Sequence, residues 1–328
     1  MNWQTFWQKK SIVNIALLPL SGIFYLATTL RRKAYQWGIL SAHRAPLPVI
    51  VVGNINVGGA GKTPLVIALG HLLEQHGIHY AVISKGYGGR FRKPTVVKAD
   101  DDARLVGDEP LLIKLKCDCP VVVAKSRVEA ANLVAEAFPD VQVILCDDGL
   151  QHYQLRRDVE LCVINHQVGL GNGWLLPAGG LRETKKRLKS VDFAVSNGDT
   201  RVPYHYILAD RGWHHIHTQA PRYHDEFSSE ETANLAISGI AHPTLFFQRL
   251  DSLGINCQNK RFPDHHQFVQ DDLRRDKTLL MTEKDWVKIK QLQHDDAWYL
   301  AVEAVLSEPL RGDFIKTVTA LLEKNRDF

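Results

Sequence analysis

The chain has 328 residues, of which 45% are hydrophobic, and this length fits two domains that each bury a core of their own. The composition excludes a disordered chain, and the net charge of +4 is compatible with an anionic partner but does not favour nucleic acid. Five cysteines without a C-x-x-C pair indicate neither a disulfide framework nor a zinc site, which fits a reducing cytosolic compartment.

Residues 1–45 are predicted to form a membrane-associated helical segment. Residues 11–30 carry no charge and are flanked by Lys9-Lys10 and by Arg31-Arg32-Lys33. This length would allow a membrane span, but Pro19 interrupts it. We therefore expect a helical hairpin or an amphipathic helix lying on the cytoplasmic leaflet, with a buried core helix as the alternative. The aromatic residues expected at the interface are Trp3, Phe6, Trp7, Phe24, Tyr25 and Trp37.

A glycine-rich stretch from Val49 to Pro64 predicts a strand, a phosphate-binding loop and a helix. A β-branched run precedes the glycines, and leucines recur at helical spacing after them. Backbone N–H groups of such a loop converge on an anion at the helix N-terminus. Lys62 would reach the terminal phosphates, and the Thr63 hydroxyl would bind Mg²⁺. The nucleotide-binding residues predicted here are Asn56, Val57, Gly58, Gly59, Ala60, Gly61, Lys62 and Thr63.

This loop departs from the strict G-x-x-x-x-G-K-[ST] pattern at Asn56, where the pattern has glycine. Asparagine tolerates a left-handed backbone better than most residues, so we expect the loop to keep its shape. An ordinary glycine-rich turn that contains a lysine is the alternative. It does not explain why Gly-Lys-Thr stands between a strand and a helix.

Strands and helices alternate up to about residue 158, which favours a doubly wound, mostly parallel α/β sheet of the P-loop NTPase type. Further strands are predicted at 80–84, 120–124 and 141–146. Asp147 and Asp148 follow the last of these, as in a Walker B element that holds the magnesium shell.

Two further polar clusters stand at predicted strand or helix ends. The glycine and cation stretch 85–90 follows the strand 80–84 and is expected at the carboxyl edge of the sheet, where such folds bind ligands. Asp108 and Glu109 precede a proline and an apolar helix. Helix capping alone would explain this acidic pair, so its function stays open at this level.

Residues 159–307 are predicted to form a second, smaller α/β lobe that closes over the substrate, and the helix 308–328 is expected to complete the core of residues 46–158. Strands are expected at 235–240 and 279–281. A long glycine-rich loop ends in Arg182 and Glu183 and is followed by the basic helix 185–189. His265 and His266 lie beside an acid, but no third ligand is spaced to complete a metal site, so a general-base partner is favoured.

The motifs together, more than any one alone, resemble the tetraacyldisaccharide 4′-kinase family, the lipid A 4′-kinases of Gram-negative bacteria. The resemblance runs from the N-terminal apolar segment to about residue 290, and Lys85 and Gly180 stand where arginine and proline are usual. The motifs are Val57-Gly58-Gly59-Ala60-Gly61-Lys62-Thr63-Pro64, Gly86-Tyr87-Gly88-Gly89, Gly107-Asp108-Glu109-Pro110, Asp147-Asp148-Gly149-Leu150-Gln151-His152, Leu176-Pro177-Ala178-Gly179 with Leu181-Arg182-Glu183, Phe262-Pro263-Asp264-His265-His266 and Thr282-Glu283-Lys284-Asp285.

The resemblance implies ATP-dependent phosphorylation of the 4′-hydroxyl of a tetraacylated disaccharide 1-phosphate at the cytoplasmic face of the inner membrane, with ATP and Mg²⁺ as cofactors. It implies no nucleic-acid partner and no obligate protein partner. Asp108 would be the base for the acceptor hydroxyl, and His265 would tune or orient it. Arg182 and Glu183 would face the substrate or its phosphates. The candidates for the metal shell are Thr63, Glu109, Asp147 and Asp148.

Three other functions remain to be weighed. A membrane-associated partitioning ATPase has a similar loop, but its signature lysine would stand at position 57, where this chain has Val57. A GTPase would need an N-K-x-D-like element, and Lys284 and Asp285 are adjacent instead. A lipid-binding module without catalysis would leave Asp108, Asp147 and Asp148 without a purpose.

Overall fold

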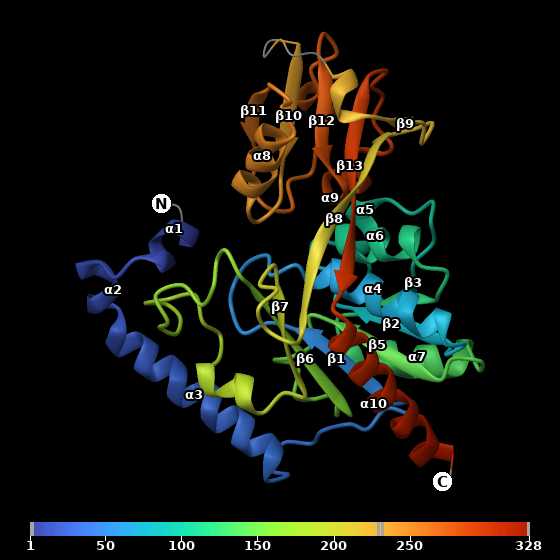
Figure 1. The fold of residues 1–328 in the computed structure, drawn as a ribbon. Coiled ribbons are helices and arrows are strands. Elements are labelled where there is room, and N and C mark those ends of the chain that lie inside the picture. Colours follow the sequence, from blue (N-terminus) through green and yellow to red (C-terminus); the bar gives the residue numbers. More distant parts are fainter. Residues whose placement is uncertain (1–2, 228–229, 231–232, 327–328) are drawn as a thin grey trace.

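The structure is a computed structural model that describes residues 3–227, 230 and 233–326. It is a mixed α/β fold with a large, mostly parallel sheet that runs through two lobes (Figure 1), as the sequence predicts. The strands are β1 (Val49–Gly53), β2 (Tyr80–Ser84), β3 (Thr95–Val96), β4 (Val121–Val123), β5 (Val143–Asp147), β6 (Val159–Asn165), β7 (Phe193–Asn197), β8 (His205–His215), β9 (Pro221–Arg222), β10 (Asn234–Ser238), β11 (Gln258–Arg261), β12 (Thr278–Thr282) and β13 (Ala297–Leu306).

Helices cover the sheet and form the N-terminal segment. They are α1 (Trp3–Gln8), α2 (Ile12–Ala16), α3 (Leu18–Gln36), α4 (Lys62–Gln75), α5 (Ala103–Val106), α6 (Asp108–Lys116), α7 (Arg127–Ala137), α8 (Pro243–Ser252), α9 (Glu283–Ile289) and α10 (Glu308–Arg326). Short 3₁₀ helices occur at Lys185–Lys189, His224–Glu226 and Gln270–Asp272. The predicted basic helix 185–189 is therefore a single 3₁₀ segment.

Alternating side chains of the central strands explain how the lower lobe packs. Ile50 and Val52 point to one face of the sheet, where they share a buried cluster with residues of α4 and α6. Val49 and Val51 point to the other face and pack with residues of α7. Because both faces are covered, each central strand reads as a continuous apolar run rather than an alternating one.

The lobes are joined by two long antiparallel strands. The sheet order is β11-β10-β12-β13-β8-β7-β6-β1-β5-β2-β4-β3. The lower end of β8 pairs in parallel with β7, and β13 pairs along β8 and, at its upper end, with β12. In Figure 1 these strands rise from the lower lobe into the upper one, which also holds α8 and α9. Side chains at the start of β8 therefore lie beside the end of β7, in the lower lobe.

The predicted boundary between the two lobes, between residues 158 and 159, lies directly before β6. This strand pairs in parallel with β1, and β7 pairs in parallel with β6, so the lower sheet continues past the division. Helix α10 returns to the lower lobe, where the buried Phe314 ring lies 6.4 Å from the ring of Phe193. In space, β8 and β13 are the strands that connect the two lobes.

The N-terminal helices lie beside the lower lobe with an apolar face exposed. Ile12 is 85% exposed and Ile23 is 65% exposed, whereas Asn14 and Ser21 are buried against the protein. Of the expected aromatic anchors, Tyr25 and Trp37 are exposed, but Trp7 donates its indole N–H to the carbonyl of Pro177 and packs on the protein. The side chain of Trp3 lies outside the described residues. Within the described part of the chain, no helix is both long and apolar enough to cross a membrane.

Candidate active site

The glycine-rich loop connects the end of β1 to the start of α4, so its backbone lies at the N-terminus of a helix, where anions bind favourably. Gly61 has φ 88°, a left-handed conformation that favours glycine. A Cβ at this position would stand 2.4 Å from the side chains of both Asn197 and Tyr206. Glycine is therefore required here for its backbone angle and for the close approach of β7 and β8.

Asn56 holds the loop by a different means from the one expected. It is not among the residues with positive φ, so the tolerance of asparagine for a left-handed backbone is not what makes it fit here. Its side-chain amide donates instead to the carbonyl of Gly169 at 2.8 Å. The N–H of Val57 donates to the carbonyl of Gly180, also at 2.8 Å. The loop is thus held by the chain around residues 169–180.

Lys62 and Asp148 form a charged group at the end of this loop. The Lys62 Nζ lies 3.4 Å from Asp148 Oδ1, and Arg182 Nη1 lies 3.6 Å from Asp148 Oδ2. Burial by itself would raise the pKa of the Asp148 carboxyl, but Lys62 and Arg182 outweigh it and the pKa is lowered. Asp148 is therefore a carboxylate that already has two cationic neighbours.

Asp147 differs from Asp148 in having no cationic side chain paired with it in the described part of the chain. It is 1% exposed, and neither carboxylate oxygen has a hydrogen-bond partner among the described residues. Burial, together with the negative charges of Glu109 and Asp148, raises the pKa of Asp147 to about 7. A buried carboxylate without partners is costly unless a cation or a proton neutralises it.

Asp108 and His265 meet across the two lobes. Asp108 is the first residue of α6 in the lower lobe, and His265 lies on the loop that follows β11 in the upper lobe. The His265 Nδ1 is 3.0 Å from Asp108 Oδ2. Burial would raise the pKa of Asp108, but the charge of Lys284 and the hydrogen bond from His265 outweigh it and hold the pKa well below its usual range. The same hydrogen bond raises the pKa of His265.

Lys284, at the start of α9, connects the acidic residues of this region. Its Nζ is 2.9 Å from Glu109 Oε1 and 3.6 Å from Asp108 Oδ2. Burial would lower the pKa of Lys284, but Glu109 and Asp108 raise it overall, so the ammonium stays charged. The sequence motif containing Lys284 was noted, but its role was missed because the partners lie about 175 residues away in the chain.

Glu183 contacts protein groups rather than open space. Its two carboxylate oxygens accept hydrogen bonds from Gln151 at 2.8 Å and from Tyr153 at 2.6 Å, and Arg187 lies 3.3 Å away. Gln151 in turn accepts a hydrogen bond from Arg182. In this structure Glu183 orients Gln151 and, through it, the Arg182 guanidinium.

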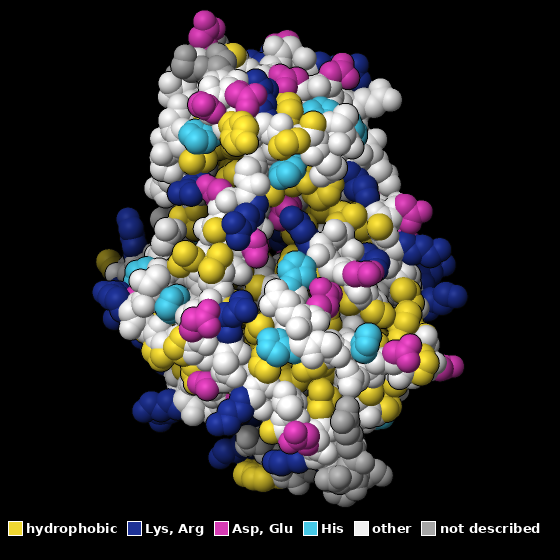
Figure 2. All heavy atoms as spheres, turned by 45° about the vertical axis from the view of Figure 1, so that its right-hand side comes forward, with side chains coloured by type: hydrophobic (Ala, Val, Ile, Leu, Met, Phe, Trp, Pro, Cys, Tyr) yellow, Lys and Arg dark blue, Asp and Glu magenta, His cyan; other side chains and the backbone are white. Residues whose placement is uncertain are grey.

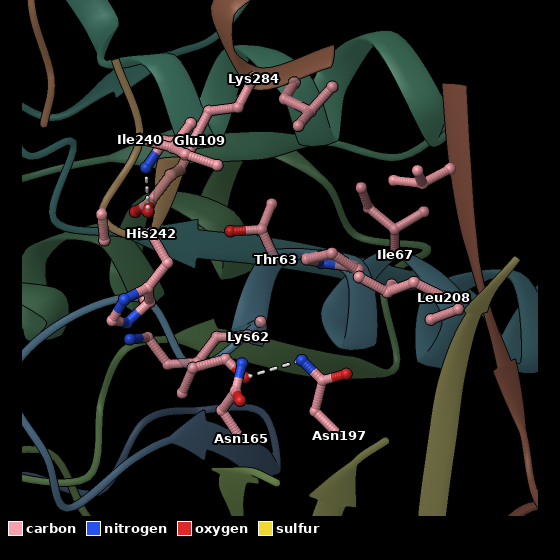
Figure 3. Close-up of a pocket in the computed structure, with 18 of the residues that line it drawn as sticks. Lys62, Thr63, Ile67, Glu109, Asn165, Asn197, Leu208, Ile240, His242 and Lys284 are labelled. Carbon is pink, nitrogen blue, oxygen red and sulfur yellow. Dashed lines mark hydrogen bonds and ion pairs between the residues drawn. The ribbon is translucent and has the colours of Figure 1, made fainter. Parts of the chain in front are cut away.

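These groups surround one cleft of about 1390 Å³ between the lobes. Figure 3 shows Lys62 and Thr63 in this cleft with Glu109, Lys284 and the upper-lobe residues Ile240 and His242. Figure 2 shows charged side chains of both signs around the hollow where the lobes meet. Asp148, Arg182 and His265 also line the cleft, whereas Asp108, 5% exposed, lies buried against His265 and Lys284.

Three residues that the sequence did not single out support this site. Tyr206 donates its hydroxyl to the Gly61 carbonyl at 2.6 Å, and Asn197 donates to the Ala60 carbonyl at 3.2 Å. Arg127, at the start of α7, donates to the backbone carbonyls of Asp147 and Asp148. All three act on backbone atoms, so no motif of side chains could have indicated them.

A strand, a glycine-rich loop ending in Lys-Thr, a helix, and an aspartate pair at the end of the neighbouring strand define the class of α/β proteins built to bind nucleoside phosphates. The chain belongs to the tetraacyldisaccharide-1-P 4′-kinase (LpxK) family, whose sequence profile matches residues 13–320. This assignment confirms the resemblance noted in the sequence and leaves no support for the partitioning ATPases.

Two relatives and one solved structure are similar to this chain along nearly its whole length. The tetraacyldisaccharide 4′-kinase of Idiomarina loihiensis is 43% identical over 304 residues, covering 91% of each chain, and that of Ruthia magnifica is 42% identical, covering 95% of this chain and 98% of its own. A crystal structure of the apo form of LpxK from Aquifex aeolicus in complex with ATP matches with a TM-score of 0.78 at 25% identity, covering 95% of this chain and all of that one.

The Asp108–His265 pair predicts a pH dependence of stability. A histidine whose folded-state pKa is raised stabilises the protein below its unfolded pKa of 6.5, and this stabilisation is lost as pH rises through the folded pKa. Asp108, with a lowered pKa, contributes above its unfolded value of 3.8. Urea unfolding of the wild type and of His265→Asn should therefore differ most between about pH 5 and 6.5 and converge in the alkaline range.

The same substitution at the exposed His79 provides the control, and should leave the pH profile as it is in the wild type. A difference between wild type and His265→Asn that is constant over the whole range would contradict an ionised pair.

Proposed function

We propose that this protein transfers the γ-phosphoryl group of ATP to the 4′-hydroxyl of a tetraacyldisaccharide 1-phosphate, a step of lipid A biosynthesis. The observation that carries the proposal is that a phosphate-binding loop and a buried carboxylate–histidine pair border one cleft between two lobes. Phosphoryl transfer needs such groups, because the phosphates must be held and the incoming hydroxyl must lose its proton. The names of the family and of the relatives agree with this reaction.

In the proposed reaction, the backbone of residues 58–63 and the Lys62 ammonium bind the β- and γ-phosphates, while the N–H of Val57 holds the loop through Gly180. The acceptor oxygen forms a bond to the γ-phosphorus while the bond to the β–γ bridging oxygen breaks, and ADP leaves with that oxygen. Lys62 and Arg182 both lie near Asp148 and face the same cleft, so their charges can stabilise the transferred group.

A magnesium ion fits the carboxylates at the end of β5. The unpartnered, buried oxygens of Asp147 are the kind of group that a cation would neutralise, and the Thr63 hydroxyl is a second candidate. Among the described residues no group of three or more His, Cys, Asp or Glu could hold a metal alone, which suits an ion that binds mostly through nucleotide phosphates. When bound, Mg²⁺ would neutralise charge on the phosphates. Glu109 and Asp148, both paired with cations, are weaker candidates.

Asp108 is our proposed base for the acceptor hydroxyl. Its lowered pKa keeps it ionised at neutral pH, and His265 and Lys284 fix its orientation. Both of these partners come from the upper lobe, so movement of that lobe would uncover the carboxylate and admit the acceptor. Closing would then exclude water, which limits hydrolysis of ATP without transfer.

We also propose that α2 and α3 contact the cytoplasmic surface of the inner membrane. Their exposed residues include Ile12, Ile23 and Leu26, while Arg31 and Lys33 stand at the end of the apolar stretch, where anionic headgroups would meet them. Arg31 also lines the cleft, which brings this end of α3 to the site where the lipid acceptor would bind. An acceptor anchored in a leaflet has to be reached from that surface.

The central test is transfer of radiolabelled phosphate from ATP to a tetraacyldisaccharide 1-phosphate in detergent. The wild type should form labelled lipid, and Lys62→Ala should slow the transfer by about a hundredfold or more, because a transition-state contact is lost. Lys85→Ala removes another positive charge from the cleft and leaves the sequence of the phosphate loop as it is, so it measures the effect of losing positive charge alone. Wild-type turnover by Lys62→Ala would contradict the phosphate-loop assignment.

The proposed base can be separated from the proposed metal ligand by single-turnover kinetics. Asp108→Asn should lower the rate strongly with little change in nucleotide affinity, whereas Asp147→Asn should weaken Mg·ATP binding or alter its metal dependence. If Asp108 and His265 act as a pair, His265→Ala should cost much less in the Asp108→Asn background than in the wild type. Fully additive losses would contradict the pair, and a normal rate for Asp108→Asn would contradict the base.

The membrane proposal predicts that the double variant Ile12→Ser/Ile23→Ser binds anionic phospholipid vesicles less tightly and has a higher KM for the lipid acceptor, with an unchanged KM for ATP. Both residues are exposed, so the substitutions should not disturb packing. Val305→Ser, at an exposed residue of β13, is the matched control. Co-sedimentation of the double variant at the wild-type level would contradict a role of this face at the membrane.

A further inference from the structure

A loop formed by residues 169–182, here called the bridging loop, lies between the N-terminal helices and the phosphate loop. Figure 1 shows it beside α1–α3 and next to the segment that follows β1. Two polar side chains of the N-terminal helices are buried against it, Asn14 with 0% and Ser21 with 6% exposure. Their neighbours Ile12 and Ile23 are exposed, so these helices present a polar face to the protein and an apolar face to the outside.

Asn14 and Ser21 both bind the backbone of this loop. The Asn14 side-chain amide donates to the carbonyl of Ala178 at 2.9 Å. The Ser21 hydroxyl accepts from the N–H of Ala178 at 3.1 Å and donates to the carbonyl of Leu175 at 2.9 Å. Both backbone groups of Ala178, a fully buried residue, are thus bonded to the N-terminal helices, and the Asn172 side-chain amide of the loop itself also donates to the Ala178 carbonyl at 2.9 Å.

The other side of the bridging loop binds the phosphate loop through its backbone. The Gly180 carbonyl accepts from the N–H of Val57 at 2.8 Å, and the N–H of Arg182 donates to the carbonyl of Ile55 at 2.7 Å. The Gly169 carbonyl accepts from the side chain of Asn56. Ala178 is only two residues from Gly180, so a shift of the loop at one contact is passed to the other.

We propose that Asn14 and Ser21 are positioning residues that couple the N-terminal helices to the nucleotide site through the bridging loop. The helices that carry the exposed apolar face then also hold the first residues of the phosphate loop in the geometry that binds ATP. The inference rests on the proposed function in one respect, since it takes the ligand of the phosphate loop to be ATP. It adds that contact of these helices with an anionic lipid surface strengthens nucleotide binding.

Asn14 allows its two roles to be separated. Its Oδ1 accepts from the N–H of Ser11 and caps α2, while its Nδ2 donates to Ala178. Asn14→Asp keeps the acceptor and loses the donor, so it preserves the cap and removes the contact with the loop, together with a longer hydrogen bond to the Phe6 carbonyl at 3.3 Å. Ser21→Ala removes the second contact, and Ser21→Thr restores a hydroxyl. Thr28→Ala is the matched control, because within the described residues the Thr28 hydroxyl bonds back to its own helix alone, to the carbonyls of Phe24 and Tyr25.

The experiment titrates the full chain with the fluorescent nucleotide mant-ATP, with and without vesicles of phosphatidylethanolamine and phosphatidylglycerol. Asn14→Asp and Ser21→Ala should each raise the Kd for mant-ATP by about fivefold, as expected for the loss of one hydrogen bond. Vesicles should lower the Kd of the wild type, of Ser21→Thr and of Thr28→Ala, but not that of the two uncoupled variants. Co-sedimentation with the vesicles should be the same for all.

A mant-ATP Kd at the wild-type level in Asn14→Asp and Ser21→Ala overturns the proposal, as does an equal vesicle effect in all variants. If Asn14→Asp does not fold by circular dichroism, Ser21→Ala decides, and unfolding of both would show that the contacts serve stability alone. Phosphate transfer to the lipid is measured in parallel. A wild type that binds mant-ATP but does not phosphorylate the lipid contradicts the proposed function, whereas an active wild type without the Kd differences contradicts the coupling.

Discussion

The proposed nucleotide site depends on a constraint set by the backbone of the glycine-rich loop. Backbone N–H groups that bind an anion cannot also be used for hydrogen bonds within the loop. The carbonyls of Ala60 and Gly61 are instead held by Asn197 and Tyr206, and the N–H of Val57 is held by Gly180. The loop is therefore held by three other parts of the chain, and one of them, β8, also leads into the upper lobe.

The charges between the lobes follow from a second constraint, that buried charges need partners. Asp108 and Glu109 of the lower lobe would be costly alone, and Lys284 and His265 of the upper lobe neutralise them. A second pair, Lys116 with Glu283, joins the same two helices, α6 and α9. Removing one member of such a pair costs more than the pair contributes, so these contacts specify how the lobes meet rather than simply adding stability.

Local patterns predicted the part of the lower lobe before residue 159 well, because its central strands each carry their own signal, whereas β6 and β7 were assigned to the second lobe. The strands β1, β2 and β5 are buried on both faces and read as apolar runs, and Gly61 is fixed by its backbone angle. The long strands β8 and β13 were not predicted, since partly exposed strands with mixed residues lack a clear period. Tyr206 and the role of Lys284 were missed for a related reason, that their partners become neighbours only after folding.

The two aspartates at the end of β5 are adjacent in the chain, but their side chains lie in different surroundings and their pKa values are shifted in opposite directions. Asp147 is the last residue of the strand and its side chain lies in the protein, whereas Asp148 has φ 48° and turns toward the cleft, where Lys62 and Arg182 surround it. One pKa is raised by burial and the other is lowered by cations. The left-handed turn at Asp148 is stabilised by Arg127, which binds the backbone carbonyls of both residues. A single arginine thus fixes the backbone from which one carboxylate is buried in the protein and the other lies in the cleft beside Lys62 and Arg182.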